Sequence, residues 1–591
     1  MSAVREVRVG LATCGIAAGA ERVAAQLRKE KESGRFDVPI KRVGCVGMCY
    51  NEPIVDVVDE FGTLTTYAHV TEADVERIVA EHVLGGTAVD ELVVKSETFF
   101  QHQVRIVLEN CGVIDPESLE EYRAQGGYVA LAAALEDMTP EDVVEAVKAS
   151  GLRGRGGGGF PTGLKWSLAA QEISPEKYVI CNADEGDPGA FMDRSVLEGD
   201  PHRVIEGMAI AAYAIGARHG YIYVRAEYPL AIERLEKALD DARAAKLLGE
   251  NILGTAFSFD MQIKAGAGAF VCGEETALIA SIEGRRGMPR KRPPYPAVYG
   301  LWGKPTNINN VETLANVPWI LRHGADAFSA YGTETSNGTK VFALAGRIKQ
   351  SGLIEIPMGM PIRQIVYDIG GGIQEDRPLK AVQMGGPSGG CIPASLADTP
   401  VDYEALKATG AIVGSGGMIV LDDSTCMVEM ARYFLDFTQK ESCGKCTFCR
   451  VGTKRMLETL ERICAGEGTP EDLEKLVDLS ENVRQYSLCG LGQTAPNPVL
   501  TTVEYFRNEY EAHIEDRACP AKTCKALIRF HIDPEACKNC GLCARDCPVE
   551  AIQAVDEGYH VIDETLCVKC GRCEQVCPFD AVEILTGKVE G

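Results

Sequence analysis

Cysteines crowd the C-terminal part of the sequence in two copies of one spaced pattern. The segments CKNCGLCARDCP and CVKCGRCEQVCP both read C-x2-C-x2-C-x3-C-P, and fifteen of the 23 cysteines fall between Cys443 and Cys577. Metal ligands need such clustering, whereas core cysteines do not. A disulfide framework is disfavoured, because a chain of 591 residues can bury a core without one. The pattern therefore predicts thiolate ligation at two neighbouring metal sites.

Residues 529–587 resemble the bacterial two-cluster ferredoxins, in which the fourth cysteine of each copy ligates the cluster of the other copy. A zinc ribbon, the alternative, uses two separated C-x2-C pairs and does not produce eight cysteines in this arrangement. The resemblance implies two [4Fe–4S] clusters, one held by Cys537, Cys540, Cys543 and Cys577 and the other by Cys567, Cys570, Cys573 and Cys547.

A glycine-rich segment, GLRGRGGGGFPTGLKW, contains one match to G-x-G-x-x-G. The preceding residues 139–151 predict a capped helix, so the loop follows a helix and a Rossmann fold is not indicated. Successive glycines allow backbone N–H groups to close around a phosphate, and Arg155 and Lys165 add cationic donors. A flexible linker would have polar residues where Phe160 and Trp166 follow the glycines. The segment is therefore a candidate phosphate-binding loop.

Three further segments combine glycines with carboxylates and amides. KYVICNADEGDPGAFMDR predicts a short strand that ends in a carboxylate cluster, which suits hydrogen bonding to ribose or ring donors or, alternatively, a solvated loop. GAGAFVCGEETALIASIEG places Glu274 and Glu275 at the start of an apolar helix, where simple capping is the alternative. GLWGKPTNINNVETLANV offers Asn309, Asn310 and Thr313 at another helix start.

In order and spacing, residues 98–512 resemble the flavin-binding component of respiratory complex I and its relatives in NAD-reducing hydrogenases and formate dehydrogenases. The resemblance implies bound FMN with NADH stacked over it, and it implies Glu185 and Glu275 as catalytic carboxylates. Asp187 stands where relatives often have glutamate, and RKRPPYP also departs from their pattern, which leaves NAD or NADP open. The implied cofactor-binding residues are Gly154, Arg155, Gly156, Gly157, Phe160, Lys165, Asn182, Asp184, Glu185, Asp187, Phe270, Gly273, Glu274, Glu275, Arg292, Tyr295, Asn309, Asn310 and Thr313.

The same resemblance covers a β-grasp domain and a third [4Fe–4S] site. ESCGKCTFCRVGT falls in an amphipathic helical region, and SLCGLG follows some forty residues later. Three thiolates at short spacing and one distant cysteine suit a cluster closed between helices. The implied ligands are Cys443, Cys446, Cys449 and Cys489.

The N-terminal residues VRVGLATCGIAAGA and RVGCVGMCYNEPIVDVV resemble the thioredoxin-like [2Fe–2S] domain. Cys14, Cys45 and Cys49 match three of its ligands, but its second early cysteine is absent. Neighbours such as Gly10 and Gly15 have no side chain that could ligate iron. The sequence leaves three outcomes open: a non-cysteine fourth ligand, a labile cluster or an empty domain.

Between the flavin-binding region and the ferredoxin region, EAHIEDRACPAKTCKAL has the spacing of a small structural metal site. We expect zinc bound by His513, Cys519 and Cys524 at a hinge with little hydrophobic core, with Cys464 as a candidate fourth ligand. The alternative is that these cysteines bind nothing. Isolated cysteines are expected to be small buried hydrophobic residues, namely Cys111, Cys181, Cys272, Cys391 and Cys426.

These sites require a multidomain α/β protein. The net charge of −25 and isoelectric point near 4.9 disfavour nucleic-acid binding. No segment is apolar enough to span a membrane, and MSAVREVRVG lacks the core of a signal peptide, so we expect a cytoplasmic protein. The expected parts are a thioredoxin-like domain (1–90), a linker (91–139), an FMN/NADH domain (140–335), a β-grasp domain (336–422), a helical [4Fe–4S] domain (423–512), the hinge (513–528) and a two-cluster ferredoxin domain (529–591).

This combination of modules most resembles the B subunit of electron-bifurcating iron-only hydrogenases. The resemblance implies NAD(P)H oxidation, or NAD(P)+ reduction, through FMN and iron–sulfur clusters, because a flavin exchanges hydride and releases electrons singly. It implies a hetero-oligomer with a small [2Fe–2S] subunit and a large catalytic iron–sulfur subunit, which exchanges electrons with ferredoxin. The alternatives are the diaphorase subunit of an NAD-dependent formate dehydrogenase, the corresponding subunit of a bifurcating transhydrogenase, and a flavin-less electron-carrying scaffold.

Overall fold

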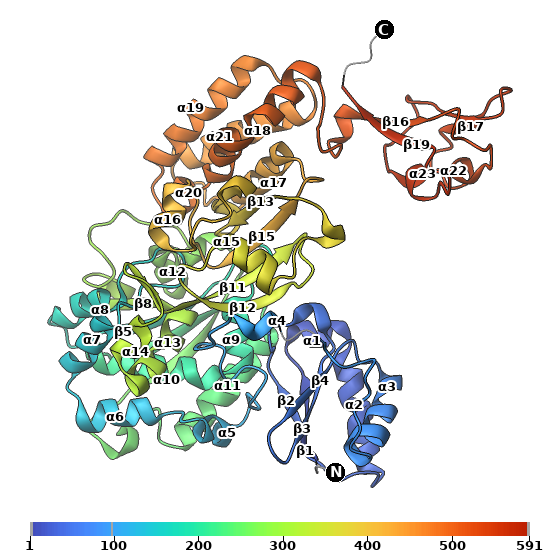
Figure 1. The fold of residues 1–591 in the computed structure, drawn as a ribbon. Coiled ribbons are helices and arrows are strands. Elements are labelled where there is room, and N and C mark those ends of the chain that lie inside the picture. The colour runs from blue at the N-terminus through green and yellow to red at the C-terminus, as the bar shows by residue number, and fades with distance from the viewer. Residues whose placement is uncertain (1–3, 96–97, 588–591) are drawn as a thin grey trace. The chain divides into compact units, whose positions relative to one another are not determined.

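The computed structural model describes residues 4–95 and 98–587 (Figure 1). The chain divides into two compact units. Unit 1 comprises residues 1–377 and 382–420, and unit 2 comprises residues 378–381 and 421–591. The N-terminal domain, the domain expected to bind flavin (140–335, here called the flavin-type domain) and most of the β-grasp sheet fall in unit 1. The cysteine-rich C-terminal modules fall in unit 2.

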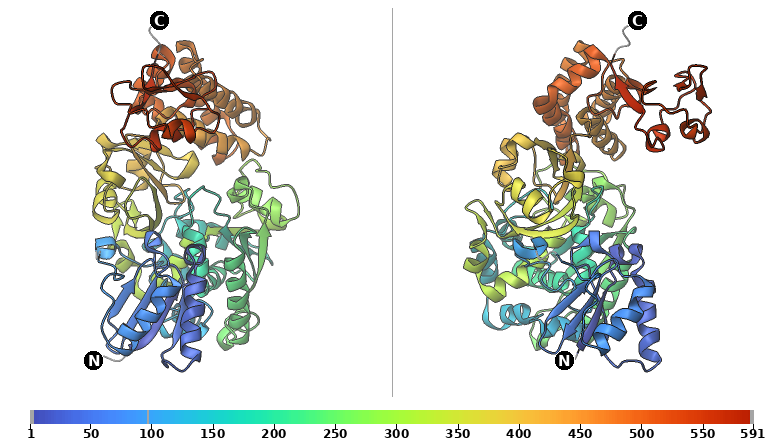
Figure 2. Two further views of the ribbon diagram at one scale, coloured as in Figure 1. Left: turned by 90° about the vertical axis from the view of Figure 1, so that its right-hand side faces the viewer. Right: turned by 45° about the vertical axis from the view of Figure 1, so that its right-hand side comes forward.

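The N-terminal domain is built on a four-stranded sheet of order β2-β1-β3-β4, from strands β1 (Val4–Gly10), β2 (Ile40–Val43), β3 (Val55–Asp59) and β4 (Leu64–Tyr67). β2 is parallel to β1, and β3 is antiparallel to β1 and to β4, which is the expected thioredoxin-like arrangement. Alternate β1 residues Val7 and Val9 pack against helices α2 (Ala20–Glu32) and α3 (Glu72–Arg77). Both helices lie along one face of this sheet (Figure 2).

The stretch 91–139 was expected as a linker, but its described residues, 91–95 and 98–139, are a folded part of unit 1. They form α4 (Thr98–Gln101), α5 (Leu119–Ala124) and α6 (Val129–Asp137). Ile106, Val107 and Leu131 are buried in the large core of the flavin-type domain. Turns separate these short apolar stretches, so they carry no helical periodicity long enough to mark them as structured.

The flavin-type domain has a four-stranded parallel sheet of order β7-β6-β5-β8. Its strands are β5 (Tyr178–Ala183), β6 (His219–Arg225), β7 (Asp260–Gly266) and β8 (Thr306–Asn310). Helices follow or precede the strands: α7 (Pro140–Ala149), α8 (Thr162–Gln171), α9 (Met192–Gly199), α10 (Pro201–Ile215), α11 (Pro229–Ala244), α12 (Glu275–Ile282) and α13 (Val311–His323). α10 is buried on nearly all sides, as its almost continuous apolar sequence requires. α7 begins at Thr139 with a capping box to Asp142, which confirms the helix predicted there.

A five-stranded β-grasp sheet follows, with the order β12-β11-β15-β13-β14. β11 (Thr339–Gly346) pairs antiparallel with β12 (Gly352–Pro357) and parallel with β15 (Gly417–Asp422). β13 (Leu379–Met384) and β14 (Gly390–Pro393) complete the sheet, and the short helices α14 (Ala325–Ser329), α15 (Ile362–Gln364) and α16 (Tyr403–Ala408) flank it in sequence. β11 is buried over six consecutive residues, so both of its faces are covered.

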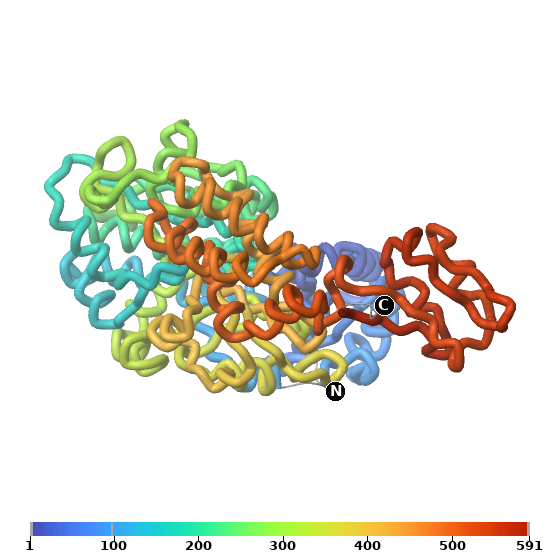
Figure 3. Tube along the Cα trace, turned by 90° about the horizontal axis from the view of Figure 1, so that it is seen from above, coloured from blue at the N-terminus to red at the C-terminus, as the bar shows by residue number. Residues whose placement is uncertain are grey.

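The helical part of unit 2 contains α17 (Met427–Lys440), α18 (Thr453–Cys464), α19 (Pro470–Tyr486), α20 (Gly490–Thr494) and α21 (Asn497–Glu511). α18, α19 and α21, orange in Figure 3, run side by side and share one apolar core. α19 starts at a capping box of Thr469 and Asp472 with Pro470 at its first turn, so local sequence defines where it begins.

The C-terminal module is small and pseudo-repeated. β16 (Ile528–Ile532) pairs antiparallel with β19 (Val582–Thr586), and β17 (Ile552–Ala554) pairs with β18 (His560–Ile562). Each cysteine run contains one short helix, α22 (Leu542–Arg545) or α23 (Arg572–Gln575). The ladder β16–β19 therefore joins the two ends of this module.

In the part of the chain that the structure describes, no helix is both long and apolar enough to cross a membrane.

Candidate functional site

The expected cofactor residues of the flavin-type domain gather where its parallel strands end. Asn182 and Asp184 lie at the end of β5, the segment 270–275 follows β7, and Asn309 and Asn310 end β8. Carboxyl ends of parallel strands meet at one edge of a sheet, and ligands of open α/β folds bind there. Segments that lie far apart in sequence are brought together in this way.

The glycine-rich loop lies at the same edge. The backbone N–H of Arg155 donates to the Thr313 hydroxyl at 2.8 Å, and a Cβ added to Gly156 would lie 2.9 Å from the Asn310 Cβ. Gly157 forms a backbone bridge with Gly414. The loop is thus packed against α13 and against Gly414, in the β-grasp segment that precedes β15, and it is not a flexible linker.

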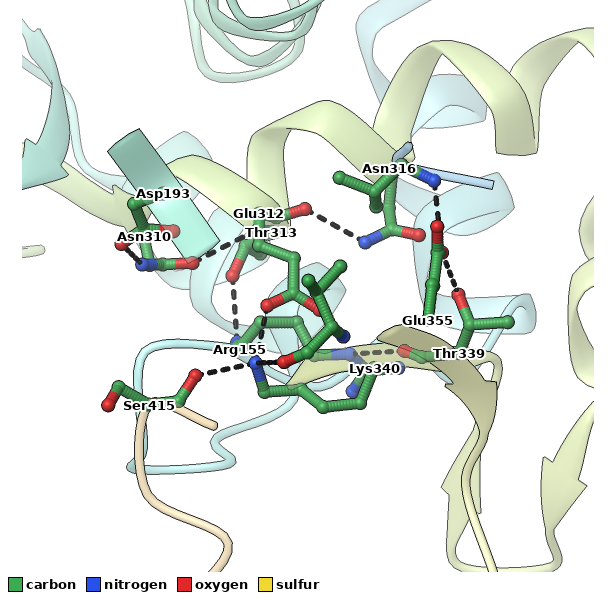
Figure 4. Close-up of polar contacts among 12 residues, drawn as sticks. Arg155, Asp193, Asn310, Glu312, Thr313, Asn316, Thr339, Lys340, Glu355 and Ser415 are labelled. Atoms are coloured by element: carbon green, nitrogen blue, oxygen red, sulfur yellow. Dashed lines mark hydrogen bonds and ion pairs between the residues drawn. The ribbon is translucent and has the colours of Figure 1, made fainter. Parts of the chain in front are cut away.

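The Arg155 guanidinium points away from the loop surface into the buried network of Figure 4. It donates to the carbonyl oxygens of Arg153, Asn337 and Thr339 at 3.0, 2.6 and 3.0 Å. The network continues through Lys340, whose amine pairs with Glu312 at 2.5 Å; both side chains are almost fully buried. This arrangement assigns Arg155 a positioning role rather than that of a phosphate ligand. The sequence did not reveal it, because both roles use the same residue type.

Lys165 is the cation that the structure directs toward the site. Its amine hydrogen-bonds to the Glu275 carboxylate and to the carbonyl oxygen of Ile308, at 2.6 Å, on β8. Arg292 approaches the same carboxylate at 3.5 Å and that of Glu274 at 3.9 Å. Two cations, Lys165 and Arg292, therefore lie against the Glu275 carboxylate at this edge.

Glu185 and Asp193 are buried between the carboxyl end of β5 and the start of α9. Glu185 accepts hydrogen bonds from the backbone N–H groups of Asp193 and Arg194 at 3.1 Å, at the start of α9. Burial raises the pKa of both carboxyls, and the charge of Glu185 raises the pKa of Asp193 further. The Asp193 carboxylate also accepts from the Asn310 amide at 2.5 Å. A protonated carboxyl behind the strand end can donate as well as accept hydrogen bonds.

Asp187 lies nearer the β-grasp segment. Removal from water raises the pKa of its carboxyl to about 6, although a hydrogen bond from the Ser415 hydroxyl opposes the shift. A Cβ on Gly386 would approach this carboxyl group to 2.7 Å. Asp187 therefore connects the turn after β5 to the β-grasp segment.

Glu274 caps the N-terminus of α12, which was the alternative explanation of its position in the sequence. Its carboxylate accepts from the backbone N–H groups of Thr276 and Ala277 at 3.0 Å. One residue earlier, the carbonyl oxygen of Gly273 accepts from the Asn182 amide at 2.9 Å. The amide of Asn309 is similarly fixed, because its oxygen accepts from the Trp166 indole N–H at 2.8 Å. These amides are pre-organised by the fold.

Aromatic side chains border this edge. Phe160 and Tyr295 expose 49% and 57% of their surface, which leaves their rings available for stacking. Phe270, in the short turn before α12, lies against Gly186, where an added Cβ would come within 2.7 Å of its ring. Phe270 thus packs against the turn after β5, whereas the other two rings face solvent.

The C-terminal module contains two cavities, and each is bordered by four of the predicted ligands. The cysteines that line the first cavity are Cys537, Cys540, Cys543 and Cys577, and those that line the second are Cys547, Cys567, Cys570 and Cys573. Each cavity therefore combines three cysteines of one run with the fourth cysteine of the other, as expected for crossed ligation. Backbone N–H groups of Ala551 and Ala581 donate to the Cys547 and Cys577 thiols at 3.3 and 3.4 Å. The donor set and its spacing fit two cubane clusters.

The third cysteine set converges between helices. Cys443 and Cys446 lie in the turn after α17, Cys449 lies in the helical segment Phe448–Gly452 and Cys489 directly precedes α20. Burial raises the pKa of Cys449 to about 11, and repulsion from the other three thiols contributes to that shift. The effect of the other three thiols on Cys449 shows that they lie close to it, as the ligands of one metal cluster would.

Three thiols also meet in the N-terminal domain. The Cys49 Sγ lies 3.8 Å from the Sγ atoms of both Cys45 and Cys14. Hydrogen bonds with the Cys45 and Cys49 thiols lower the pKa of Cys14 to about 3, and the charge of Arg194 contributes to this shift. The backbone N–H of Gly47 donates to the Cys45 sulfur at 3.3 Å. These thiols are placed as ligands of one small metal group.

A buried Cys3His cluster occupies the expected hinge. The ligand atoms of Cys426, His513, Cys519 and Cys524 all lie within 4.8 Å of one another. His513 Nε2 is 3.4 Å from the Cys426 sulfur and 3.3 Å from that of Cys524. His513 Nδ1 lies 2.6 Å from the carbonyl oxygen of Glu509, an arrangement that leaves Nε2 for a metal. The donor set fits a tetrahedral zinc site.

Two expectations about this site require correction. Cys426 is not merely a small hydrophobic residue, because it precedes α17 by one position and completes the cluster from 87 residues away from His513. The surroundings are not poor in core either, since Val428, Ile514 and Leu527 pack in the same apolar cluster. Cys464 instead groups with Glu429 and Cys524. Only the helix packing that returns α21 to the start of α17 could reveal Cys426.

The other isolated cysteines meet expectation, because Cys111, Cys181, Cys272 and Cys391 are all buried.

Sequence families match three stretches of the chain. The Nuo51 FMN-binding domain matches residues 147–319, the NADH-ubiquinone oxidoreductase-F iron–sulfur binding region matches residues 429–513, and a 4Fe–4S dicluster domain matches residues 530–584. These ranges coincide with the strand-edge site, the third cysteine set and the paired cysteine runs.

Whole-chain comparisons agree with these matches. The "NADP-reducing hydrogenase subunit HndC" of Solidesulfovibrio fructosivorans is 59% identical over 458 residues, which is 78% of this chain and 93% of that protein. An F-type subunit of the NADH-quinone oxidoreductase of Rhizobium meliloti is 48% identical over 70% of this chain and 99% of its own. A chain of the NAD+-reducing [NiFe]-hydrogenase, solved in the H2-reduced state, superposes with a TM-score of 0.62 and 32% identity, covering 86% of this chain and 84% of its own. The chain thus belongs to the family of flavin and iron–sulfur NAD(P)H oxidoreductase subunits that includes HndC and the F-type subunits of NADH-quinone oxidoreductases.

Proposed function

We propose that this chain is the NAD(P)H-oxidising subunit of an electron-bifurcating hydrogenase that couples NADH, ferredoxin and H2. The observation that carries the proposal is the presence, in one chain, of a stretch that matches the FMN-binding domain family and of further cysteine sets beyond the family's own iron–sulfur region. Identity of 59% to a subunit of an NADP-reducing hydrogenase supports the hydrogenase context. The partners would be a small [2Fe–2S] subunit, a large catalytic iron–sulfur subunit and ferredoxin, in a hetero-oligomer.

The residues at the strand edge would hold FMN and the nicotinamide nucleotide. When bound, FMN accepts a hydride and releases electrons singly, chemistry that no side chain supplies. Lys165 and the loop N–H groups would neutralise the phosphate, and the Asn182, Asn309 and Asn310 amides would hydrogen-bond to the cofactor. We propose Glu275 as the carboxylate next to the bound nucleotide and Glu185 as the carboxyl behind the reacting ring. The exposed rings of Phe160 and Tyr295 would stack on the nucleotide.

The cysteine sets would hold three [4Fe–4S] clusters and, in the N-terminal domain, one [2Fe–2S] cluster. Paired cavities with crossed cysteines support the two ferredoxin-type clusters. The third is supported by the rise in the Cys449 pKa that the neighbouring thiols of Cys443, Cys446 and Cys489 contribute to. The close approach of Cys14, Cys45 and Cys49 supports the small cluster.

A zinc ion would occupy the Cys3His cluster. Its role would be structural, because four protein ligands leave no open position for a substrate. The cluster links the start of α17 to the segment that leads into the ferredoxin-type module, so zinc would fix where that module begins.

Two enzymatic alternatives share the same subunit plan: the diaphorase subunit of an NAD-dependent formate dehydrogenase, and the corresponding subunit of a bifurcating NADH/NADPH–ferredoxin transhydrogenase. NAD and NADP are both supported by relatives, one described as NADP-reducing and the other as NAD+-reducing. A flavin-less scaffold is disfavoured by the intact glycine loop and its lysine.

The test is affinity purification of the tagged chain from its own cells under anaerobic conditions. Copurification of a hydrogenase catalytic subunit, with NADH- and ferredoxin-dependent H2 formation that needs both reductants, is the expected result. A copurifying molybdopterin protein with formate-dependent NAD+ reduction would establish the formate dehydrogenase alternative. Absence of flavin absorbance in the purified chain would establish the scaffold.

A further inference from the structure

The three thiols of the N-terminal domain are one ligand short of the four side chains that a [2Fe–2S] cluster takes. Another ligand could approach them at the C-terminal end of β1. Gly10 is the last residue of this strand, and its N–H donates to the carbonyl oxygen of Ile54 at 3.2 Å, so the segment that leads into β3 lies beside it. Cys14 follows shortly afterwards in the chain. Gly10 itself has no side chain, so a ligand must come from another segment.

The Glu52 carboxylate occupies that space. A Cβ added to Gly10 would lie 3.3 and 3.4 Å from its two carboxylate oxygens, and no closer to any other group. A Cβ added to Gly15 would meet the carbonyl oxygen of Gly10 first, at 2.2 Å, and would lie 3.0 Å from the same carboxylate. Gly10, at the end of β1, and Gly15, in helix α1 (Thr13–Ala18), therefore both lie close to this one acidic side chain.

The loop that carries two of the thiols also carries Glu52. Cys49 opens a single 3-10 turn that ends at Asn51, and Glu52 follows it directly. The backbone N–H of Glu52 closes this turn on the carbonyl oxygen of Cys49 at 3.5 Å. The turn fixes the spacing between a thiol and a carboxylate on the same loop.

Glu52 is costly to bury as it stands. Its side chain is only 9% exposed, and within residues 4–95 and 98–587 no ion pair reaches it. Its pKa is raised to about 8, mainly by burial and also by the charges of Cys14 and Asp56, against one hydrogen bond from the backbone N–H of Ile54 at 3.0 Å. A buried carboxylate beside thiolates needs a positive charge to compensate it. A metal centre at these thiols would supply that charge.

We propose that Glu52 is the fourth protein ligand of the N-terminal iron–sulfur cluster, in the place of the missing cysteine. This inference rests on the [2Fe–2S] cluster proposed above. Carboxylate oxygen is an established ligand of protein-bound iron. The cluster would have three thiolate ligands and one carboxylate ligand, and the carboxylate, that of Glu52, lies next to the end of β1.

The experiment uses the anaerobically purified full-length protein, reduced with dithionite. EPR is recorded at a temperature where the faster-relaxing [4Fe–4S] signals are broadened away, and iron is counted per chain. Glu52→Gln should remove or strongly alter the slowly relaxing [2Fe–2S] spectrum and lose about two irons. The matched control is Asp56→Asn, a nearby buried carboxyl on β3, which should keep the wild-type spectrum and iron content.

A ligand exchange provides the second arm. Because the atoms nearest to a Gly10 Cβ all belong to the Glu52 carboxylate, Gly10→Cys combined with Glu52→Ala places a thiol in the vacated space. This double variant should recover the cluster with the g values of all-thiolate ligation, whereas Glu52→Ala alone should not. Wild-type spectra and iron content in Glu52→Gln and Glu52→Ala would overturn Glu52 as a ligand while leaving the cluster intact. If the wild-type protein lacks the signal and Cys45→Ser leaves its iron content unchanged, the cluster itself is absent and both proposals fail.

Discussion

Individual side chains at the strand edge serve two different purposes. Lys165 spans from the helix after the glycine loop to β8 and reaches a carboxylate, whereas Arg155, within the loop, is enclosed by carbonyl oxygens. A buried guanidinium whose donors are engaged in this way stabilises the loop but is not available to a ligand. The residue whose removal should affect cofactor binding directly is therefore Lys165.

Lys165→Ala should weaken FMN binding, because it removes the cation on α8 that we propose neutralises the FMN phosphate. A hydrogen bond to a charged group contributes about 1.5–3 kcal/mol, so the loss of affinity is expected to be roughly ten- to hundredfold. Flavin released during gel filtration measures it. Lys237→Ala on the surface of α11 is the control and should retain flavin as the wild type does. Full retention in Lys165→Ala with unchanged NADH–dye activity would remove Lys165 from the site.

At the Cys3His cluster, Cys426 and Cys464 offer a direct comparison. Cys426→Ser removes one of four converging ligand atoms and should reduce bound zinc from about one per chain to well below that value. Cys464→Ser should retain zinc, because Cys464 lies outside the group that includes His513. Elemental analysis of the two purified variants measures the difference. Zinc retained in the first and lost in the second would exchange the two assignments.

Among the elements, the glycine loop contains two adjacent glycines whose backbone is constrained to different degrees. Gly157 has a φ of +110° and pairs with Gly414, so a side chain there meets the neighbouring backbone at 3.3 Å. At Gly158, the next residue, an added Cβ meets nothing within 4 Å. Conformation, more than space alone, makes the first of these positions glycine-dependent.

Gly157→Ala should therefore destabilise unit 1, whereas Gly158→Ala should be close to neutral in the cofactor-free protein. Strain of this kind costs about 1–3 kcal/mol. Urea unfolding of the flavin-depleted protein, followed by tryptophan fluorescence, measures the difference between the two variants. Equal stability would mean that the loop relaxes around the new methyl group.

On the scale of the whole molecule, the strand-edge site and the ferredoxin-type module belong to different compact units of one chain. The strand-edge site lies in unit 1, while the ferredoxin-type module and the Cys3His cluster lie in unit 2. Cys519 connects the cluster to the ferredoxin-type module, because its backbone N–H donates to Thr586 on β19 at 2.7 Å. Loss of metal at this point should reach the module without reaching the flavin site.

Cys519→Ser should lower electron exchange with ferredoxin several-fold while NADH-dependent reduction of an artificial dye stays near the wild-type rate. The dye takes electrons from the flavin or from nearby clusters, whereas ferredoxin exchange requires the terminal ones. Both activities are measured on the same preparation, together with zinc and flavin content. A parallel fall of both activities, or zinc absent from the wild type, would show that the cluster does not have this separating role.

Local pattern in the sequence was sufficient for the parts in which ligands or caps lie close together along the chain. The paired cysteine runs predict their crossed cavities, and Thr139 and Pro140 predict the start of α7. The glycine loop and the strand at 178–183 were also recognisable, since their residue types are required by backbone conformation and by burial on both faces.

Tertiary structure alone decided the features that depend on contacts between distant segments. Cys426 approaches His513, which lies 87 residues away in the sequence, and the Arg155 side chain donates a hydrogen bond to the carbonyl oxygen of Thr339. Helix α6, in the stretch expected as a linker, is part of the core because it packs on α10 and α13. Glu52 fills the space beside Gly10 only because β1 and the segment before β3 are paired. Periodicity and spacing report which residues share a short stretch of backbone, but the partner of a buried charge or thiol is chosen by packing, which joins residues regardless of their separation in sequence.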